Sequence, residues 1–583
     1  MTVVAGWTIL LSFGKGCGKL CAMSQSANAP APPPVVFNRF FFKAILLPGL
    51  CCSIWANPVI YPHSVVNAAS YQAPGLPSGS IAQGSVFTIF GAALGPAVGV
   101  EQHSFPLQNV FSSVAISVVQ GKQTVSAIPL YVSQAQINAL MPSNTPLGWV
   151  SLTVTYNNAT SNPSPVYIVH DSPGIFTFTG AGLGPAALQN AVTATNLPNN
   201  SNQTSAMPGQ YAIAYLTGLG PITASDNQPP PVGTLATPLE IWVGDVPATV
   251  LYSGRSSCCS GLDQINFIVP ATAPQGCWVP VWVRTSHATV SNFTSMAIGA
   301  NGGPCSDAAN PYSATVVNGG AVGLLALTRL SVHEDLGVNS PVDVTNDFVN
   351  FNATQQPGGA YAFSPWLSTP PRGTCTVYQG TGDFLSSGQL PAAGQPMLDG
   401  GTGVNVAGPA GQQNATLGAG AAAALGSYLP LYSFPNQLYL NPGSFTVTTS
   451  GGANVGSLSA TIAVPAPLTW TNRDQTVVVD RTQPLVLNWT GTTASQTVAI
   501  IGVSSDLPTN SSAMFLCYAP AGAATFTVPP EVLGAIPASR SHALSSKNVI
   551  YLISSSTASI SIKGLASGEA AAIYIGGKTV AFR

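Results

Sequence analysis

The chain has 583 residues, of which only 6% are charged, and its formal net charge at pH 7 is −2. Ordinary soluble domains carry about 25% charged residues, so the chain has no basic field that would attract nucleic acid or an anionic membrane. Hydrophobic residues make up 46% of the chain, so it has enough apolar residues to form a core and is not expected to be disordered. The many Val, Thr, Tyr and Phe residues, with 59 Gly and 50 Pro, favour short strands joined by turns. The expected class is therefore all-β.

Residues 1–56 are interpreted as an N-terminal extension that ends in an export signal. Arg39 and Lys43 precede a 13-residue apolar run that ends at Ala56, which suits a signal core and is too short to span a bilayer. Met23 is an alternative start, and a buried strand is the alternative interpretation of the run. No later apolar run approaches about 18 residues, so we expect no transmembrane span in the mature chain and a secreted or cell-surface location.

The segments 61–174 and 175–303 are expected to be two copies of one domain. Three short matches carry the repeat: Gln136, Ile137 and Asn138 match Gln264, Ile265 and Asn266; Leu94, Gly95 and Pro96 match Leu219, Gly220 and Pro221; Leu130 and Tyr131 match Leu251 and Tyr252. The offset between the copies rises from 121 to 128 residues along the chain, so the second copy needs a seven-residue insertion, near Cys258 and Cys259. One structural plan used twice explains these offsets.

Within each copy, short runs of β-branched and aromatic residues alternate with polar ones, as in 85–90 and 151–156. Several such strands per ~100 residues predict a two-sheet, immunoglobulin-like sandwich in each copy. Gln136 and Asn138 are interpreted as side chains that tie a loop to the backbone, with ligand contact as the alternative.

Several segments then carry a family resemblance: 67–71, 85–96, 131–142, 172–176 and, in the second copy, 258–259 with 263–266. They resemble a repeat domain of uncharacterised exported acidobacterial proteins, the Solibacter-type family, whose domains are similar to the IPT/TIG immunoglobulin-like module. The resemblance implies an exported protein of tandem sandwich modules, which usually act as spacers, adhesive arms or accessory domains. It implies no particular activity.

The second half of the chain is expected to hold a β-rich domain, 311–465, and a C-terminal β-rich domain, 466–583. Its strand-like segments are 324–332, 342–351, 444–449 and 485–489. Gly- and Ala-rich sequence around 400–424 is expected to form loops. A short helix is expected to begin at the Pro529-Pro530 pair, and a closing hairpin is expected in 574–582.

Six cysteines follow the export segment: Cys258, Cys259, Cys277, Cys305, Cys375 and Cys517. An even number in an exported chain predicts three disulfides. Because adjacent cysteines rarely bridge each other, we expect the first two to bond with the next two in either order, and Cys375 to bond with Cys517. A metal site is the less favoured alternative, because these cysteines contain no Cys-x-x-Cys pair and His is scarce.

No motif in the sequence names a reaction. Gly-x-Ser-x-Gly and His-Glu-x-x-His do not occur, so no catalytic residue, cofactor or metal ligand is predicted. The histidines are scattered along the chain: His63, His103, His170, His287, His333 and His542. The densest acidic cluster is interpreted as a solvated loop, with calcium binding as the alternative; its members are Glu334, Asp335, Asp343, Asn346 and Asp347.

Trp278 and Trp282 share one face of a strand and are interpreted as buried between sheets, with stacking on a sugar or a protein as the alternative. The leading functional hypothesis is a non-catalytic role in adhesion, surface or matrix interaction, with an unknown extracellular protein or glycan as the partner. The alternatives are a carbohydrate-active or other hydrolase with its site in 311–583, and an accessory sugar-binding module.

Overall fold

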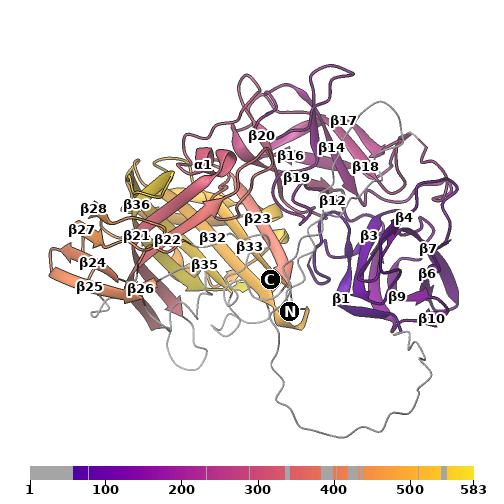
Figure 1. The fold of residues 1–583 in the computed structure, drawn as a ribbon, viewed down its shortest axis with the longest axis horizontal. Coiled ribbons are helices and arrows are strands. Elements are labelled where there is room, and N and C mark those ends of the chain that lie inside the picture. The colour runs from indigo at the N-terminus through magenta and orange to yellow at the C-terminus, as the bar shows by residue number, and fades with distance from the viewer. Residues whose placement is uncertain are drawn as a thin grey trace, which may run out of the picture.

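The computed structural model describes residues 57–583 except 77, 232, 288, 335–341, 382–397, 402, 418–430, 434–437, 510 and 540–547. The predicted export segment and Asp335 lie outside the described residues. The described part consists almost entirely of β-strands arranged in several sheets, which confirms the all-β class with immunoglobulin-like tandem domains (Figure 1). No helix in this part is long and apolar enough to cross a membrane.

The first copy of the repeat folds into one set of strands around a single apolar core. Its strands are β1 (Val59–Asn67), β2 (Ile81–Ala82), β3 (Val86–Ala92), β4 (Val100–Glu101), β5 (Val110–Phe111), β6 (Val114–Gln120), β7 (Gln123–Val132), β8 (Gln136–Leu140), β9 (Gly148–Tyr156), β10 (Ala159–Thr160) and β11 (Ser164–Val169). They pair in the order β1-β3-β8-β7-β6-β9-β11-β2. Alternate residues, such as Val114, Ile116 and Val118 of β6, point into the core.

The second copy repeats this order. Its strands are β12 (Gly174–Ile175), β13 (Leu188–Ala191), β14 (Tyr211–Thr217), β15 (Gly233–Thr234), β16 (Leu239–Val243), β17 (Val246–Arg255), β18 (Asp263–Ile268), β19 (Gly276–Thr285) and β20 (Thr294–Ile298). The order β12-β14-β18-β17-β16-β19-β20 matches the first seven strands of the other copy, position by position. Even a break in register recurs, since β7 is irregular beside Leu130 and β17 is irregular beside Leu251. The two copies therefore share one topology.

The rest of the chain forms a larger sheet. Its elements are α1 (Ser313–Asn318), β21 (Gly320–Glu334), β22 (Val342–Gln356), β23 (Cys375–Thr381), β24 (Gly403–Gly408), β25 (Gly411–Leu417), β26 (Leu431–Ser433), β27 (Gly443–Thr449), β28 (Leu458–Val464), β29 (Thr469–Trp470), η1 (Arg473–Gln475), β30 (Val478–Val479), β31 (Leu485–Thr490), β32 (Thr497–Asp506), η2 (Leu507–Thr509), β33 (Ser511–Tyr518), β34 (Thr525–Val528), α4 (Pro530–Gly534), β35 (Val549–Ser559), β36 (Ser567–Thr579) and β37 (Ala581–Phe582). Twelve of these strands form one sheet, in the order β23-β33-β32-β35-β36-β21-β22-β26-β25-β24-β27-β28.

This sheet corrects the expected division at 465/466. Strand β21 pairs in parallel with β36, and β23 pairs with β33, so both expected C-terminal domains contribute to the same sheet. Pairing between strands so distant in sequence leaves no local pattern in the sequence. The Pro-rich segment near 465 does leave one, and it predicted a domain boundary that the sheet crosses. We call this unit, residues 313–583, the C-terminal body.

Two local expectations in the C-terminal body have different outcomes. Helix α4 does begin at Pro530, after Pro529 in an extended conformation. The closing hairpin in 574–582 is wrong, because β36 runs without a break through Gly576 and Gly577 and is paired on both sides. A Cβ at Gly577 would lie 2.9 Å from the Tyr551 ring, so the glycine permits close packing inside a strand instead of making a turn.

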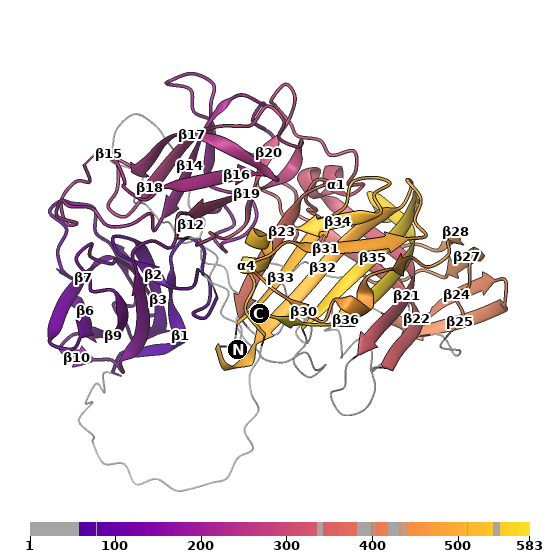
Figure 2. The same cartoon turned by 180° about the vertical axis from the view of Figure 1, so that it is seen from behind.

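The three units pack directly on one another. The second copy lies beside both the first copy and the C-terminal body in both views (Figure 1, Figure 2). One apolar core contains Leu76 of the first copy, Trp282 and Phe293 of the second, and Phe515 of the C-terminal body. The chain is therefore a fused assembly of sandwiches and not a string of independent modules.

Candidate functional site

The repeat-motif residues lie in strands and not in loops. Gln136 Nε2 donates to Asn138 Oδ1 at 3.0 Å in β8, and Gln264 Nε2 donates to Asn266 Oδ1 at 2.7 Å in β18. Residues two apart in a strand share a face, which explains why these side chains bond to each other. The interpretation that they tie a loop to the backbone is therefore wrong, and Ile137 and Ile265 between them are core residues.

A second repeated element was missed by sequence reasoning. Asn162 bonds with both backbone groups of Ile60, at 2.9 and 3.1 Å. Asn292 does the same with Ile175 at 2.8 and 3.0 Å. Each Asn follows a Ser whose hydroxyl accepts a backbone N–H from the preceding strand. The Ser-Asn pairs 161–162 and 291–292, 130 residues apart, are the sequence signal that could have identified this clamp.

The expected disulfide pairing is right for one bond and wrong for the others. Cys375 bonds to Cys517, as expected, directly across the β23–β33 pair. Cys277 bonds to Cys305, so the expected bonds from Cys258 and Cys259 to these two cysteines are wrong. Strands β19 and β20 form an antiparallel pair that places Ile298 opposite Gly276. The chain leaving β20 therefore passes the start of β19, with the Cα atoms of Cys277 and Cys305 5.2 Å apart.

Trp278 and Trp282 are buried, with exposed fractions of 2% and 4%, which confirms the expected burial. Trp282 stacks on Trp242 at a centroid distance of 5.1 Å and on Phe293 at 5.5 Å. Trp278 Nε1 donates to the Ala362 carbonyl at 3.1 Å. Both faces of β19 are covered because the C-terminal body packs on the outer face of the second copy.

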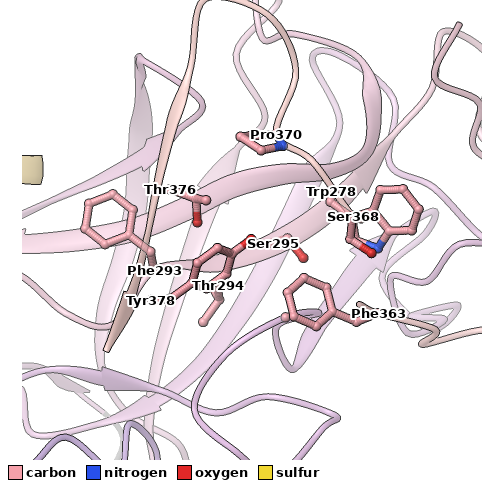
Figure 3. A pocket seen from close by; sticks show the side chains of 10 residues that line it. Trp278, Phe293, Thr294, Ser295, Phe363, Ser368, Pro370, Thr376 and Tyr378 are labelled. Atoms are coloured by element: carbon pink, nitrogen blue, oxygen red, sulfur yellow. The ribbon is translucent and has the colours of Figure 1, made fainter. Parts of the chain in front are cut away.

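A small pocket lies at this junction (Figure 3), with Trp278 and Phe363 towards one end and Phe293 and Tyr378 towards the other. Its free volume is about 10 Å³, which is room for about one water molecule. Sites for small-molecule ligands usually measure about 300–1,000 Å³. This pocket is therefore a packing feature of the junction.

A larger hollow of about 400 Å³ lies over β24, β25 and β27. Asn405, Asn414, Thr448 and Thr449 are among its lining residues, and Asn405 Nδ2 donates to Asn414 Oδ1 at 2.6 Å. Its described lining offers amides and hydroxyls but no carboxylate. It could hold a polar ligand by hydrogen bonding, and it lacks the paired acids that glycoside hydrolysis requires.

Two carboxylates of the acidic cluster, those of Asp343 and Asp347, lie in β22 and are paired. Asp347 lies in β22, is buried, and forms a bidentate ion pair with Arg329 at 2.7 and 2.8 Å. Its Oδ2 also accepts the backbone N–H groups of Tyr439 and Leu440. Asp343 bonds with His333 at 2.9 Å. A charge on the facing strand therefore satisfies Asp347, so the solvated-loop interpretation is wrong for this residue.

A buried ion pair joins the two copies. Arg255 bonds to Asp263, and its Nη2 also donates to the Gly84 carbonyl of the first copy at 2.7 Å and to the Gly220 carbonyl at 2.8 Å. Asp263 accepts the Leu219 N–H at 2.8 Å. Burial raises the pKa of Asp263, and the Arg255 charge opposes that shift. The junction of the copies therefore depends on a fully buried, multiply bonded charge pair.

Two histidines that looked scattered in the sequence meet at the same junction. His170 and Asp171 follow β11, and His287 lies in the turn after β19. The Nδ1 atoms of both histidines face Asp171 Oδ1, at 3.2 Å for His170 and closer for His287. Among the described residues, these three are a group whose ligand atoms, all within 4.8 Å of one another, could hold a metal ion.

One aromatic pair is exposed on the first copy. Trp149 of β9 and Tyr167 of β11 are opposite each other, with exposed fractions of 66% and 44% and ring centroids 5.1 Å apart. Alternation along β9 places Val150 in the core and Trp149 outside. The two rings are inclined at 59° to each other, and we call this exposed aromatic pair the platform.

The chain was compared with known proteins at three levels. No protein-family model matches it, and no curated protein matches it. Among solved structures, gamma-CGTASE from Alkalophilic bacillus clarkii is 10% identical with a TM-score of 0.15, covering 48% of this chain and 35% of that one. A crystal structure of titin domains is 8% identical with a TM-score of 0.12, covering 70% and 96%. Sidekick-1 immunoglobulin domains 1-4 are 10% identical with a TM-score of 0.11, covering 89% and 100%.

The chain thus spans about a third of the length of the gamma-CGTASE. Overall similarities at these scores carry no functional argument. The strand content, sheet order and disulfides of the chain define it as a multidomain protein of immunoglobulin-like β-sandwiches.

Proposed function

We propose that the chain is an exported, non-catalytic protein that acts outside the cell as a rigid adhesive or matrix element. The family resemblance of its first half to Solibacter-type exported repeat proteins is part of this proposal. Two disulfides support it, because such bonds persist in oxidising compartments and are rare in the cytosol.

The observation that carries the proposal is the fusion of the sandwiches into one body. Arg255 bonds across the junction of the copies, and Asn202 donates from the second copy to the backbone of Ala360 and Ala362 in the C-terminal body. Buried polar contacts of this kind fix the orientation of one module on the next. A fixed orientation suits a load-bearing or presenting element better than independent hinged modules do.

The direct test is export followed by an activity screen. The complete gene is expressed in a bacterial host, and the protein of the medium and cell surface is sequenced from its N-terminus, which we expect at Asn57. The purified chain is then screened on a glycan array and on a panel of hydrolase substrates. Export without turnover supports the proposal, and saturable glycan binding without turnover favours an accessory sugar-binding module. Retention in the cytoplasm, or turnover of any substrate, contradicts it.

A second candidate function, sugar binding, is favoured by the exposed Trp149–Tyr167 platform. Aromatic rings can stack on the apolar faces of sugar rings, and fully covering a large apolar side chain contributes about 1.5–3 kcal/mol. The platform lies on the sheet face of β9 and β11, where an extended glycan can reach it without entering a cleft.

The platform can be tested with one variant and a matched control. Trp149→Ala is expected to weaken glycan binding about tenfold, since about 1.4 kcal/mol corresponds to a factor of ten. Trp366, with an exposed fraction of 52%, lies in the C-terminal body, and Trp366→Ala serves as the control with unchanged affinity. Equal affinities of all three proteins would remove the platform from consideration.

A further inference from the structure

The carboxylate of Asp171 is buried and only half satisfied. Its side chain is 1% exposed, and while Oδ1 faces both imidazoles, Oδ2 is buried without a hydrogen-bond partner. A buried carboxylate oxygen in this position carries an uncompensated desolvation cost. The Arg255 guanidinium, which reaches the nearby Gly220 carbonyl, is already bonded to Asp263.

The backbone around the cluster is fixed from both copies. Ser172, next to Asp171, donates its N–H to the Gly218 carbonyl at 2.9 Å, and its carbonyl accepts Asn67 Nδ2 at 3.1 Å. On the other side, the Ser286 N–H donates to the Pro238 carbonyl at 2.9 Å. The three side chains therefore project from two anchored segments and do not come from one flexible loop.

We propose that His170, Asp171 and His287 form a binding site for a divalent transition-metal ion, with Zn²⁺ as the expected occupant. Two imidazole nitrogens and one carboxylate oxygen are common zinc ligands, and three protein ligands leave a fourth position for water. Nitrogen ligands favour Zn²⁺, Cu²⁺ and Ni²⁺ over Ca²⁺ and Mg²⁺. The cation would compensate the buried carboxylate charge.

The spacing of the ligand atoms is close to what a tetrahedral ion needs. Metal–ligand distances of about 2.0–2.2 Å place the ligand atoms about 3.4 Å apart. The His170 Nδ1–Asp171 Oδ1 separation is 3.2 Å. The shorter separation between His287 Nδ1 and Asp171 Oδ1 lengthens when the His287 ring rotates, because this side chain lies in a turn and is 60% exposed.

Access and space are also provided. The exposed fractions of the His170 and His287 side chains, 43% and 60%, leave an entry path from solvent. Gly220 makes room for the His170 ring, since a Cβ there would lie 3.1 Å from its Cε1 and 3.4 Å from its Nδ1. Gly220 belongs to the repeated Leu-Gly-Pro element, so the repeat itself shapes one wall of the site.

An ion bound here would join the end of the first copy to a turn of the second. Because the ligands come from both copies, the folded junction binds the metal and the separated copies do not. Metal binding would then stabilise the junction. At saturating Zn²⁺ we expect the melting temperature of the full chain to rise by about 5 °C.

The test uses the full oxidised chain without a histidine tag, stripped with EDTA and titrated with ZnCl₂ by calorimetry. We expect one ion per chain and a reversal of the rise in melting temperature on adding EDTA. His170→Gln and His287→Gln are each expected to weaken binding at least about tenfold. His103→Gln is the control with unchanged binding, because His103 is an exposed histidine beside a single carboxylate, that of Glu101.

Binding of less than one Zn²⁺ per chain, or wild-type affinity in both histidine variants, would overturn the proposal. Both histidines are partly exposed, so their variants should fold, which circular dichroism checks. If a variant does not fold, CoCl₂ added to the wild-type chain decides instead. Visible absorption bands of tetrahedral Co²⁺ with nitrogen ligands support the site, and the octahedral spectrum of aqueous Co²⁺ refutes it.

Discussion

Replacing Arg255 should destabilise the junction of the two copies strongly. In Arg255→Met, Asp263 stays at 0% exposure without its cation, and the carbonyls of Gly84 and Gly220 lose their donor. Removing one partner of a buried ion pair costs about 3–5 kcal/mol. Since about 1.4 kcal/mol is a factor of ten, amide exchange in β17 and β18 should accelerate about 10²- to 10⁴-fold.

Hydrogen-exchange mass spectrometry is the suitable assay, because a chain of several units need not unfold in one step. Peptides that cover Gly84 and β3 should also exchange faster, since Arg255 bonds to the first copy. The control is Arg473→Met, which removes pairs with the exposed carboxylates of Asp343 and Asp474 and should cost at most about 1 kcal/mol.

A double variant separates charge from packing. Arg255→Met combined with Asp263→Leu removes both charges, and it should recover at least about 2 kcal/mol of the loss because no unpaired ion remains buried. An acceleration below tenfold in the single variant would refute the argument. So would a double variant as unstable as the sum of its single replacements.

Three further predictions follow from the described contacts. Replacing Cys375 and Cys517 with Ala should destabilise the C-terminal body by about 5 kcal/mol, because that bond closes a loop of 142 residues. Loss of the Cys277–Cys305 bond, which closes a 28-residue loop, should cost about 3.5 kcal/mol. Calorimetry with and without reductant measures both losses of stability, and equal losses would contradict the loop-entropy argument. Burial raises the pKa of Tyr71, Tyr518 and Tyr551 to about 12. Because these values exceed the unfolded value of about 10, the stability that these groups contribute is complete below pH ~10 and is lost as the pH rises to ~12. Phenolate absorbance from these residues should therefore appear together with unfolding, and ionisation that precedes the loss of the dichroism signal would contradict this prediction. Asn292→Ala should cost about 3 kcal/mol in thermal unfolding and Asn162→Ala less, because Asn292 is 2% exposed and bonds additionally to the Gly182 carbonyl at 2.7 Å. A larger cost for Asn162→Ala would contradict this argument from burial and the additional bond.

The sequence allowed the prediction of features that have a local period or a repeat. Alternation in 85–90 and 151–156 identified strands, and matching offsets identified two copies with one strand order. Both features can be predicted because alternating side-chain directions and repeated domains each leave a regular pattern along the sequence. The Cys375–Cys517 bond was also predicted, although the elimination behind it assigned wrong partners to Cys277 and Cys305.

The features that the sequence did not reveal depend on contacts between distant segments. The pairing of β21 with β36 joins parts of the chain separated by the whole C-terminal body. His170 and His287 meet only because the end of the first copy packs against a turn of the second, and neither has a flanking motif. Asp347 looked solvated in a cluster of acids until its neighbour across the sheet, Arg329, was known.

The seven-residue insertion in the second copy gives the clearest link between sequence and assembly. Arg255 stands at its start and Gly261 near its end. Gly261 has a φ of +76°, and a Cβ there would lie 2.6 Å from side-chain atoms of Val86 and Leu140 in the first copy. Its carbonyl accepts the Thr217 hydroxyl, whose oxygen in turn accepts the Val86 N–H at 2.9 Å.

The segment that breaks the symmetry of the repeat is therefore one of the segments that bind the copies together. The insertion places a charge pair and a glycine against the start of β3 and the end of β8 of the first copy. Gly261→Val should accordingly separate the copies while leaving each sandwich folded, because its added side chain has no space at the junction.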